Sequence, residues 1–143
     1  MAADGKTFKA NVTKWAKQFH VNLEGLARQC CYELSYRVIL DTPVDVGFLR
    51  GSWQPSLNSP SSASGGSGAP EVALSATLTG IKLGDIFWMT NNAAYALRLE
   101  YGFVGPDKLG RVYNQAGRYY VTSNMKKWDA IVQDVAKQLA GQA

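Results

Sequence analysis

The sequence has a single histidine, His20, and only two cysteines, which are the adjacent residues Cys30 and Cys31. These side chains are too few to supply the nitrogen and sulfur ligands of a zinc site. Neighbouring residues of a helix point in different directions, so we do not expect the two cysteines to form a disulfide. A secreted scaffold held together by disulfides is therefore excluded, and a reducing compartment is expected.

Long apolar runs are also missing. No stretch of about 18 consecutive apolar residues occurs, so no membrane-spanning helix and no membrane partner are expected. The first residues, Met1–Lys6, contain no apolar run of signal-peptide length. Charged residues make up only 18% of the chain, but its hydrophobic fraction of 46% is that of a globular protein and excludes global disorder. A chain of 143 residues is expected to form one domain, 1–143.

The sequence also lacks the signatures of common catalytic sites. It contains no Gly-x-Ser-x-Gly nucleophile elbow, no Walker phosphate loop and no dinucleotide fingerprint. The acidic residues are scattered, which gives no support to paired acid–base catalysis. His20 is expected to be structural or solvated, and the cysteines to be small apolar side chains of a helix. We therefore expect no enzyme activity, no catalytic residue, no cofactor and no metal; a hydrolase that uses His20 is a weaker alternative.

Apolar residues recur at steps of three and four from Val12 to Leu40, with polar residues mostly between them. This spacing predicts a long amphipathic helix. Gly25 lies in the middle of the pattern, where a bend or break is an open alternative. Pro43 disfavours helical geometry at Thr42 and is expected to end the helix.

A turn and a strand are expected next. Residues 49–57 alternate between apolar and polar, which predicts a half-buried strand, and Pro55 confines it to the edge of a sheet or ends it. Residues 58–70 are nearly all small, polar or structure-breaking. They predict a flexible Ser/Gly-rich loop in the isolated subunit.

The second half of the chain is expected to alternate short elements with one long helix. Pro70 favours a short helix over residues 70–83, with a strand as the alternative, and residues 86–90 predict a strand. Asn91 or Asn92 would cap a helix over 93–101 that Gly102 ends. Residues 102–113 are expected to be a loop, and apolar steps of four and three predict a last helix from 115 to 140. These elements indicate an α+β fold, in which a small antiparallel sheet packs against a long N-terminal helix and a C-terminal helix.

The charge balance is mildly basic. Fifteen Lys and Arg against eleven Asp and Glu give a net charge of +4. Residues 108–128 contain no acid, and their cations are interleaved with aromatic residues. We identify these cations as candidates for contact with DNA or with an acidic partner: Lys108, Arg111, Arg118, Lys126 and Lys127. The alternative is a solvated helix face beside core aromatics.

Two segments stand out from the rest of the sequence. The first is Thr42–Trp53, with the sequence TPVDVGFLRGSW, and the second is Ile86–Gly102, with the sequence IFWMTNNAAYALRLEYG. Trp53 is expected to project from its strand into the core or into an interface. Most of these residues are expected to hold the fold rather than to react.

The charged residues of the two segments have specific expected roles. Asp45 and Gly47 predict a turn that leads the chain from the helix into the strand. Arg50 and Arg98 are candidates to pair with Asp45 or Glu100, which would hold the turn against the short helix.

The order and spacing of the two segments resemble the neck, or tail-completion, family of long-tailed double-stranded DNA bacteriophages, over about residues 8 to 140. The residues that match the motifs of this family are Thr42, Pro43, Asp45, Gly47, Leu49, Arg50, Trp53, Asn92, Tyr95, Glu100 and Gly102. The resemblance implies a structural virion protein of the head–tail junction, located in the neck or tail and assembled in the cytoplasm of the host.

The resemblance also implies partners. We expect a homo-oligomeric ring, most simply a hexamer, that joins the tail to the head connector and lets double-stranded DNA pass. Its neighbours would be connector or head-completion proteins on one side and tail-terminator or tail-tube proteins on the other. The alternative function is a free-standing basic module that binds nucleic acid through residues 108–128.

Overall fold

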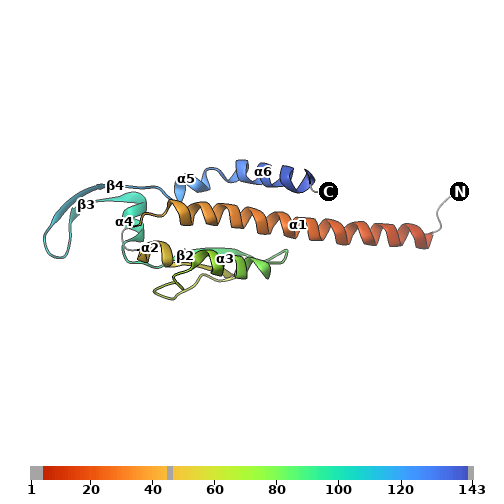
Figure 1. The fold of residues 1–143 in the computed structure, drawn as a ribbon, viewed down its shortest axis with the longest axis horizontal. Coiled ribbons are helices and arrows are strands. Elements are labelled where there is room, and N and C mark those ends of the chain that lie inside the picture. Colours follow the sequence, from red (N-terminus) through yellow and green to blue (C-terminus); the bar gives the residue numbers. More distant parts are fainter. Residues whose placement is uncertain (1–4, 45–46, 142–143) are drawn as a thin grey trace.

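The computed structural model describes residues 5–44 and 47–141 and confirms the expected α+β class. Figure 1 shows the arrangement of its elements. In chain order these are α1 (Gly5–Asp41), α2 (Phe48–Gly51), β1 (Trp53–Leu57), α3 (Pro70–Thr79), β2 (Phe87–Asn91), α4 (Ala96–Tyr101), β3 (Gly102–Pro106), β4 (Val112–Ala116), α5 (Thr122–Met125) and α6 (Trp128–Gly141).

Helix α1 is the longest element and the support for the rest. It has 37 residues, which correspond to roughly 55 Å, and it starts before the predicted Val12. The helix continues through Gly25 without a break. At its end, the backbone N–H of Thr42 donates a hydrogen bond of 3.0 Å to the carbonyl of Val38. The predicted end of the helix before Pro43 is therefore confirmed.

The main core lies between α1, α3 and the sheet of β1 and β2. The two strands pair antiparallel, with Trp53 opposite Asn91 and Leu57 opposite Phe87. Leu74 and Leu78 of α3 and Ile39 of α1 are almost fully buried in this core. Helix α3 begins at Pro70, so the helical interpretation of this segment is correct and the strand alternative is wrong.

Two expectations for short elements need correction. Residues 48–51 are not the start of a strand but the helical turn α2, which follows Gly47 at a φ of 82°. The strand begins only at Trp53. The helix expected from residue 93 begins at Ala96, and its N-cap residue Tyr95 makes no side-chain capping hydrogen bond. The side-chain amides of Asn91 and Asn92 donate instead to backbone carbonyls of residues 49–63.

The stretch expected as a loop after Gly102 is instead a β-hairpin. Strands β3 and β4 pair antiparallel, with Gly102 opposite Ala116 and Pro106 opposite Val112. Gly102 has a φ of 85°, and a Cβ atom there would lie 2.5 Å from the carbonyl oxygen of Gln115. Only glycine fits this close approach of the two strands.

The last predicted helix is shorter than expected and has a break. Residues 115 and 116 belong to β4, and Tyr119 has a φ of 50° that no helix adopts. Helices α5 and α6 follow, and α6 packs along α1 through a second apolar cluster around Cys30, Ile131 and Val135. The prediction of one long C-terminal helix is therefore correct only for the second half of its range, which α6 occupies.

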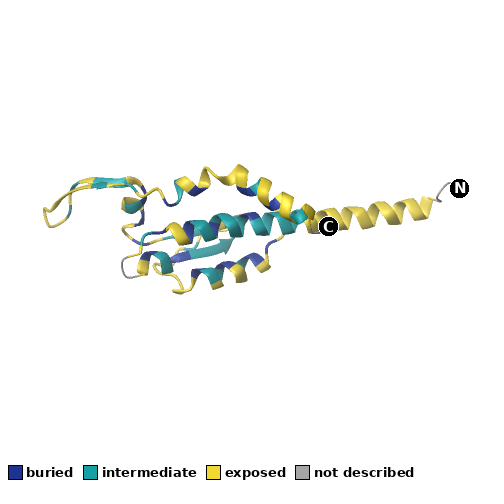
Figure 2. Cartoon of the chain, turned by 45° about the horizontal axis from the view of Figure 1, so that its top comes forward, coloured by how far each residue is buried: buried dark blue, intermediate teal, exposed yellow. Residues whose placement is uncertain are grey.

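The molecule is elongated, with a different element extending from each end. The N-terminal half of α1 extends past the end of α6, and the β3–β4 hairpin extends in the opposite direction (Figure 1). Figure 2 shows the residues of this part of α1 coloured as exposed. Among the described helices, none is long and apolar enough to cross a membrane.

Candidate functional site

The fold brings the two motif segments together around Trp53. The side chain of Trp53 is 6% exposed, and its indole Nε1 donates a hydrogen bond of 2.8 Å to Oγ1 of Thr42. Oγ1 of Thr42 donates in turn to the carbonyl of Val38 at 2.6 Å. The ring of Tyr120 meets Trp53 edge-on, with centroids 6.5 Å apart. Of the two positions expected for Trp53, the described chain has it in the core.

Asn91 connects the second segment to the first. Its side-chain Nδ2 donates to the carbonyl of Leu49 at 2.8 Å, and its Oδ1 accepts the backbone N–H of Ala93 at 3.1 Å. Asn91 lies in the second segment but was not among the residues that match the family motifs. The two adjacent asparagines in the sequence indicated that one of them makes a local hydrogen bond, but only the structure distinguishes the roles of the two.

Asn92 holds the Ser/Gly-rich loop rather than capping a helix. Its Nδ2 donates to the carbonyls of Ser61 and Ala63 at 2.9 and 2.8 Å. Nε2 of Gln54 also donates to the carbonyl of Ala63, at 3.0 Å. A Cβ atom on Gly66 would lie 2.3 Å from the carbonyl oxygen of Gly51. The loop expected to be flexible therefore lies close against the body and is attached to it at several points.

The two motif arginines do not pair with Glu100. Arg50 donates to the carbonyls of Leu40 and Thr42 at 2.8 and 3.1 Å, beside the C-terminal end of α1, where a positive charge is favoured. Arg98 lies over the ring of Phe103, 3.9 Å from its centroid. Asp45 lies outside the described residues, so its expected pairing is not part of this structure.

Glu100 is a buried carboxylate that holds α4 against α5. It accepts the backbone N–H groups of Val121 and Thr122 at 2.9 and 2.8 Å, and the hydroxyl of Thr122 at 2.6 Å. Burial acts to raise the pKa of Glu100, but these hydrogen bonds outweigh it and hold the pKa below its ordinary value. The role of Glu100 in the described structure is therefore structural.

A surface pocket of about 340 Å³ lies beside the motif residues. Its walls include Pro43, Leu49 and Tyr95, and the exposed side chains of Val44 and Phe48 stand at its rim. The rings of Phe48 and Tyr95 are 6.4 Å apart. The motif residues at the surface thus line a small depression that is mostly apolar, and Tyr95 and Arg118 bring the polar side chains among the residues that line it.

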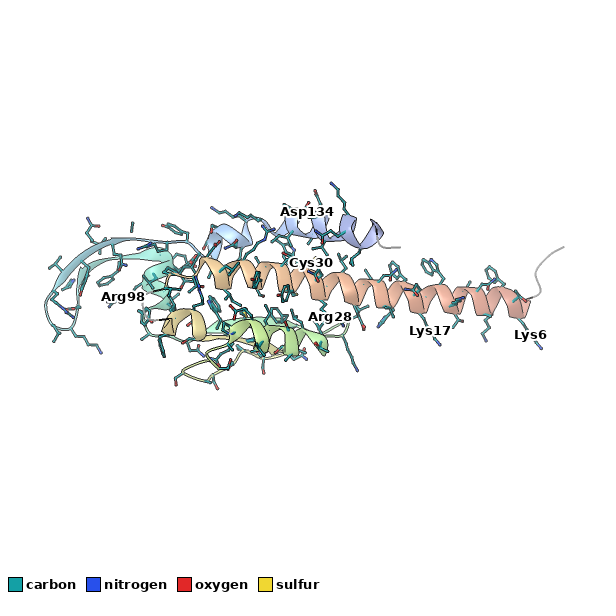
Figure 3. The ribbon with its side chains drawn as sticks, viewed as in Figure 1. Lys6, Lys17, Arg28, Cys30, Arg98 and Asp134 are labelled. Carbon is teal, nitrogen blue, oxygen red and sulfur yellow. The ribbon has the colours of Figure 1, made fainter. Side chains whose placement is uncertain are left out.

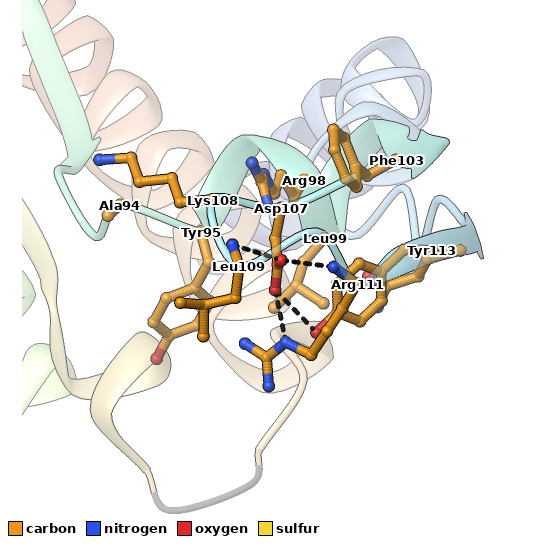
Figure 4. A pocket seen from close by; sticks show the side chains of 11 residues that line it. Ala94, Tyr95, Arg98, Leu99, Phe103, Asp107, Lys108, Leu109, Arg111 and Tyr113 are labelled. Atoms are coloured by element: carbon orange, nitrogen blue, oxygen red, sulfur yellow. Dashed lines mark hydrogen bonds and ion pairs between the residues drawn. The ribbon is translucent and has the colours of Figure 1, made fainter. Parts of the chain in front are cut away.

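A larger depression of about 690 Å³ lies between α4 and the hairpin (Figure 4). Asp107 organises its rim by accepting the backbone N–H groups of Leu109 and Arg111 at 2.8 and 2.9 Å and Nε of Arg111 at 2.6 Å. Loss of water acts to raise the pKa of Asp107, but the hydrogen bonds from Arg111 outweigh it and lower the pKa. The charge of Arg111 is therefore partly balanced within the hairpin.

The five cations expected to contact DNA or a partner are all exposed. They occupy three places: Lys108 and Arg111 lie on the hairpin loop, Arg118 follows β4, and Lys126 and Lys127 lie between α5 and α6. The hairpin loop and the α5–α6 junction lie well apart in Figure 1. The described cations therefore do not form one continuous basic patch.

The residues with potential for catalysis or metal binding are separate from one another. His20 is exposed, with Nε2 3.0 Å from Oε1 of Glu24. Burial raises the pKa of the thiols of Cys30 and Cys31, which favours the unreactive protonated form. Among the described residues, no group of three or more His, Cys, Asp and Glu is placed to hold a metal ion.

The two extended elements expose large apolar side chains. On the N-terminal half of α1 these include Phe8 and Trp15, which are 67% and 66% exposed. On the hairpin they are Val104, Leu109 and Val112, each more than three-quarters exposed.

Comparison of the chain with protein-family models, with curated proteins and with solved structures gave no match. Function must therefore be inferred from the residues and their geometry.

Proposed function

We propose that this protein is a structural component of the bacteriophage head–tail junction, a neck or tail-completion protein that works as a ring between the head connector and the tail. The resemblance of the two motif segments to that family supports this proposal. The contacts that join these segments in one chain, from Trp53 to Thr42 and from Asn91 to Leu49, are consistent with their acting as one unit.

The main structural support is the exposure of apolar residues at both ends of an elongated chain. The β3–β4 hairpin has Val104 and Val112 on its surface, and the N-terminal half of α1 has Phe8 and Trp15. Soluble monomers seldom leave such residues uncovered on extended elements, whereas subunits of an assembly bury them against neighbours. Contacts through two different ends are heterologous, and heterologous contacts close into a ring when the rotation between subunits allows it.

The motif residues have a supporting role in this proposal. Trp53 and Glu100 are buried, and their hydrogen bonds hold α1, the β1–β2 sheet, α4 and α5 in fixed positions. Helix α4 leads directly into the hairpin at Gly102. A rigid base of this kind fixes the direction of the hairpin, which is what a subunit needs to meet its neighbours reproducibly.

The proposed partners are the connector or head-completion proteins, the tail-terminator or tail-tube proteins, and the DNA that passes through the ring. The exposed cations, Lys126 and Lys127 among them, would face the DNA or an acidic neighbour. The contrasting proposal, a free-standing nucleic-acid-binding module, requires the same cations to bind oligonucleotides in the isolated protein.

The experiment is complementation of phage that lack this protein, with electron microscopy of the particles. We expect separate heads and tails without the protein, and density for a closed ring of this chain at the junction when it is supplied. The hairpin variant Val112→Asp should fail to join heads to tails, whereas Asn114→Asp, an exposed polar position on the same strand, should join them. Particles that join normally without the protein would overturn the proposal.

A further inference from the structure

The N-terminal part of α1, residues 5–22, extends beyond the other described elements of the protein; we call it the arm. All of its residues are exposed. Five of them are large and apolar, and four of these five recur at steps of four, three and four: Phe8, Val12, Trp15 and Phe19, which are 67%, 47%, 66% and 50% exposed. Their spacing places them on one face of the helix. The rings of Trp15 and Phe19 stack with centroids 5.3 Å apart.

This apolar stripe continues the face of α1 on which α6 packs. Beyond Phe19, the same steps of three and four lead through Leu23 and Leu26 to Cys30. Cys30 is buried in the cluster that α6 forms with α1, and Leu26 packs against that cluster. One continuous seam therefore runs along α1, and α6 covers only its second half.

The end of α6 limits what can cover the rest of the seam. Leu139, near the C-terminal end of α6 at Gly141, still packs against the Cys30 cluster. Beyond this end the arm continues alone, as Figures 1 and 2 show. Packed helices have axes about 8–10 Å apart, so α6 holds any flat surface away from the seam. The outer surface of α6 and the uncovered seam of the arm therefore differ in height by about the thickness of one helix, and we call this difference the step. A second helix in line with α6 fills the step, whereas a flat lipid surface does not reach the seam.

We propose that the arm of a second copy of this chain lies antiparallel along the arm of the first and covers this seam. The two arms have the same length, about 27 Å, so each fills the step beside the other. Each arm also presents the same apolar face, which makes the contact self-complementary about a two-fold axis. A parallel pair is excluded because the second α1 would continue into the space that α6 occupies.

The helix ends support the antiparallel direction. In this arrangement the N-terminal end of the second α1 faces the C-terminal end of α6. The positive end of one helix dipole thereby meets the negative end of another, and Lys6 adds a positive charge at the same place.

The charges of the arm predict a salt dependence. The arm contains four lysines and no acidic residue, so its formal charge of +4 is as large as the net charge of the whole chain. The lysines are Lys6, Lys9, Lys14 and Lys17. Helical spacing puts Lys6, Lys14 and Lys17 opposite the apolar stripe and leaves Lys9 at its flank. Two arms therefore repel each other through charges outside the contact, and added salt should strengthen the pair by screening them.

The buried area indicates a dimer of moderate strength. Each copy contributes three aromatic side chains that are half to two-thirds exposed in the single chain. At about 150–250 Å² for a fully buried aromatic, the pair would bury on the order of 1,000 Å². This is near the lower limit for a specific interface, so we expect a dissociation constant in the micromolar range. The inference does not rest on the proposed function. It concerns the free protein, and in a ring of the proposed kind the arm would leave this isologous pair for a heterologous contact with a neighbouring subunit.

Sedimentation velocity of the purified full chain over micromolar concentrations tests the pair. We expect a monomer–dimer equilibrium that strengthens with added salt and that weakens at least tenfold in Phe19→Ser. Val21→Ser is the matched control, because Val21 is 59% exposed on the opposite face of the same arm, and it should leave the equilibrium unchanged. Because every residue of the arm is exposed, neither change should alter the thermal unfolding of the body.

Three outcomes of this experiment would overturn the inference. The first is a monomer at all concentrations, and the second is an oligomer that Phe19→Ser leaves intact. The third is co-sedimentation of the chain with anionic phospholipid vesicles that Phe19→Ser abolishes, since this would assign the arm to a lipid surface.

Disulfide trapping tests the direction of the arms. Phe8 of one copy should lie near Phe19 of the other, so an oxidised mixture of Phe8→Cys and Phe19→Cys chains should give mainly the mixed dimer. A parallel pair would instead give dimers of each variant with itself and would contradict the proposed geometry. The wild-type chain, which retains Cys30 and Cys31, is the control for disulfides that do not involve the arm.

Discussion

The indole Nε1 of Trp53 donates to Oγ1 of Thr42, and this hydroxyl donates to the carbonyl of Val38. The threonine hydroxyl thus satisfies a buried indole and at the same time caps the last turn of α1. Because Thr42 is 1% exposed, no water can replace either hydrogen bond. This pair links the end of the long helix to the first residue of β1.

Replacing Thr42 with Val should destabilise the protein by about 1–3 kcal/mol, because the indole N–H then has no acceptor in a buried site. Thr42→Ser retains the hydroxyl and should cost distinctly less. Urea unfolding at neutral pH would measure both values. Equal losses for Val and Ser would show that the methyl group of Thr42, not its hydroxyl, stabilises this corner.

Truncating Trp53 to Ala should cost about 3–5 kcal/mol, because it leaves a cavity between α1, the sheet and Tyr120. The control is Trp88→Ala on the paired strand β2, where the side chain is 39% exposed. Its truncation removes less buried area and should cost clearly less. Denaturant unfolding of both variants gives the comparison, and a loss at position 53 no larger than at 88 would contradict the buried position of Trp53.

Glu100 should make stability fall in acid. Its pKa is lowered in the folded protein, so the carboxylate contributes stability above the ordinary pKa of a glutamate and loses it as the pH falls through the lowered folded value. Glu100→Gln should be less stable at pH 7 and should show a weaker loss of stability between roughly pH 5 and pH 3. Unfolding measured across this range checks the slope.

Asp107 is the control for this pH dependence. Its pKa is also lowered, but its hydrogen bonds with Leu109 and Arg111 lie within the hairpin and join no element of the core. Asp107→Asn should leave the pH dependence of the unfolding of the body nearly unchanged. If Glu100→Gln kept the wild-type slope, the acid sensitivity would have to come from other carboxylates.

Gly102→Ala should disrupt the base of the hairpin. The substitution combines a positive φ of 85° with a Cβ atom 2.5 Å from the carbonyl oxygen of Gln115. Gly110 is the matched control, because its φ is 80° but nothing lies within 4 Å of its Cβ position. Gly110→Ala should therefore cost only about 1 kcal/mol of backbone strain, and Gly102→Ala more. Amide hydrogen exchange across β3 and β4 would separate the two effects.

The sequence predicted the elements with strong periodicity and missed those without it. The apolar steps of α1 and the run of β2 identified both elements. The hairpin was missed because β3 contains Gly102, Gly105 and Pro106, all depleted in strands. Its pairing depends on Gly102 meeting Gln115 across the hairpin, a contact that no local pattern encodes.

The candidate site was predicted in part. Thr42, Trp53 and Glu100 were identified from the motif segments, and all three are buried in the structure. Their hydrogen-bond partners were not predictable, because Arg50 donates to backbone carbonyls and Glu100 accepts from the start of α5. Sequence spacing ranks such partners poorly, since every nearby carbonyl or N–H competes with the side chain of opposite charge.

The last prediction concerns the lysines at the junction of α5 and α6. Lys126 and Lys127 are exposed, and neither side chain forms a hydrogen bond with the described residues. Their replacement by Glu should therefore leave the unfolding free energy within about 0.5 kcal/mol of wild type. If they face the passing DNA or an acidic neighbour, the double variant should lose head–tail joining or infectivity in the complementation experiment. Lys137→Glu, on the exposed surface of α6, is the control for the change of charge alone.

Oligonucleotide binding by the isolated chain, measured as a function of salt concentration, separates the head–tail joining function from the nucleic-acid-binding function. A steep slope that the double variant reduces would favour the nucleic-acid-binding module, whereas normal infectivity of the variant would show that the two lysines are only solvated.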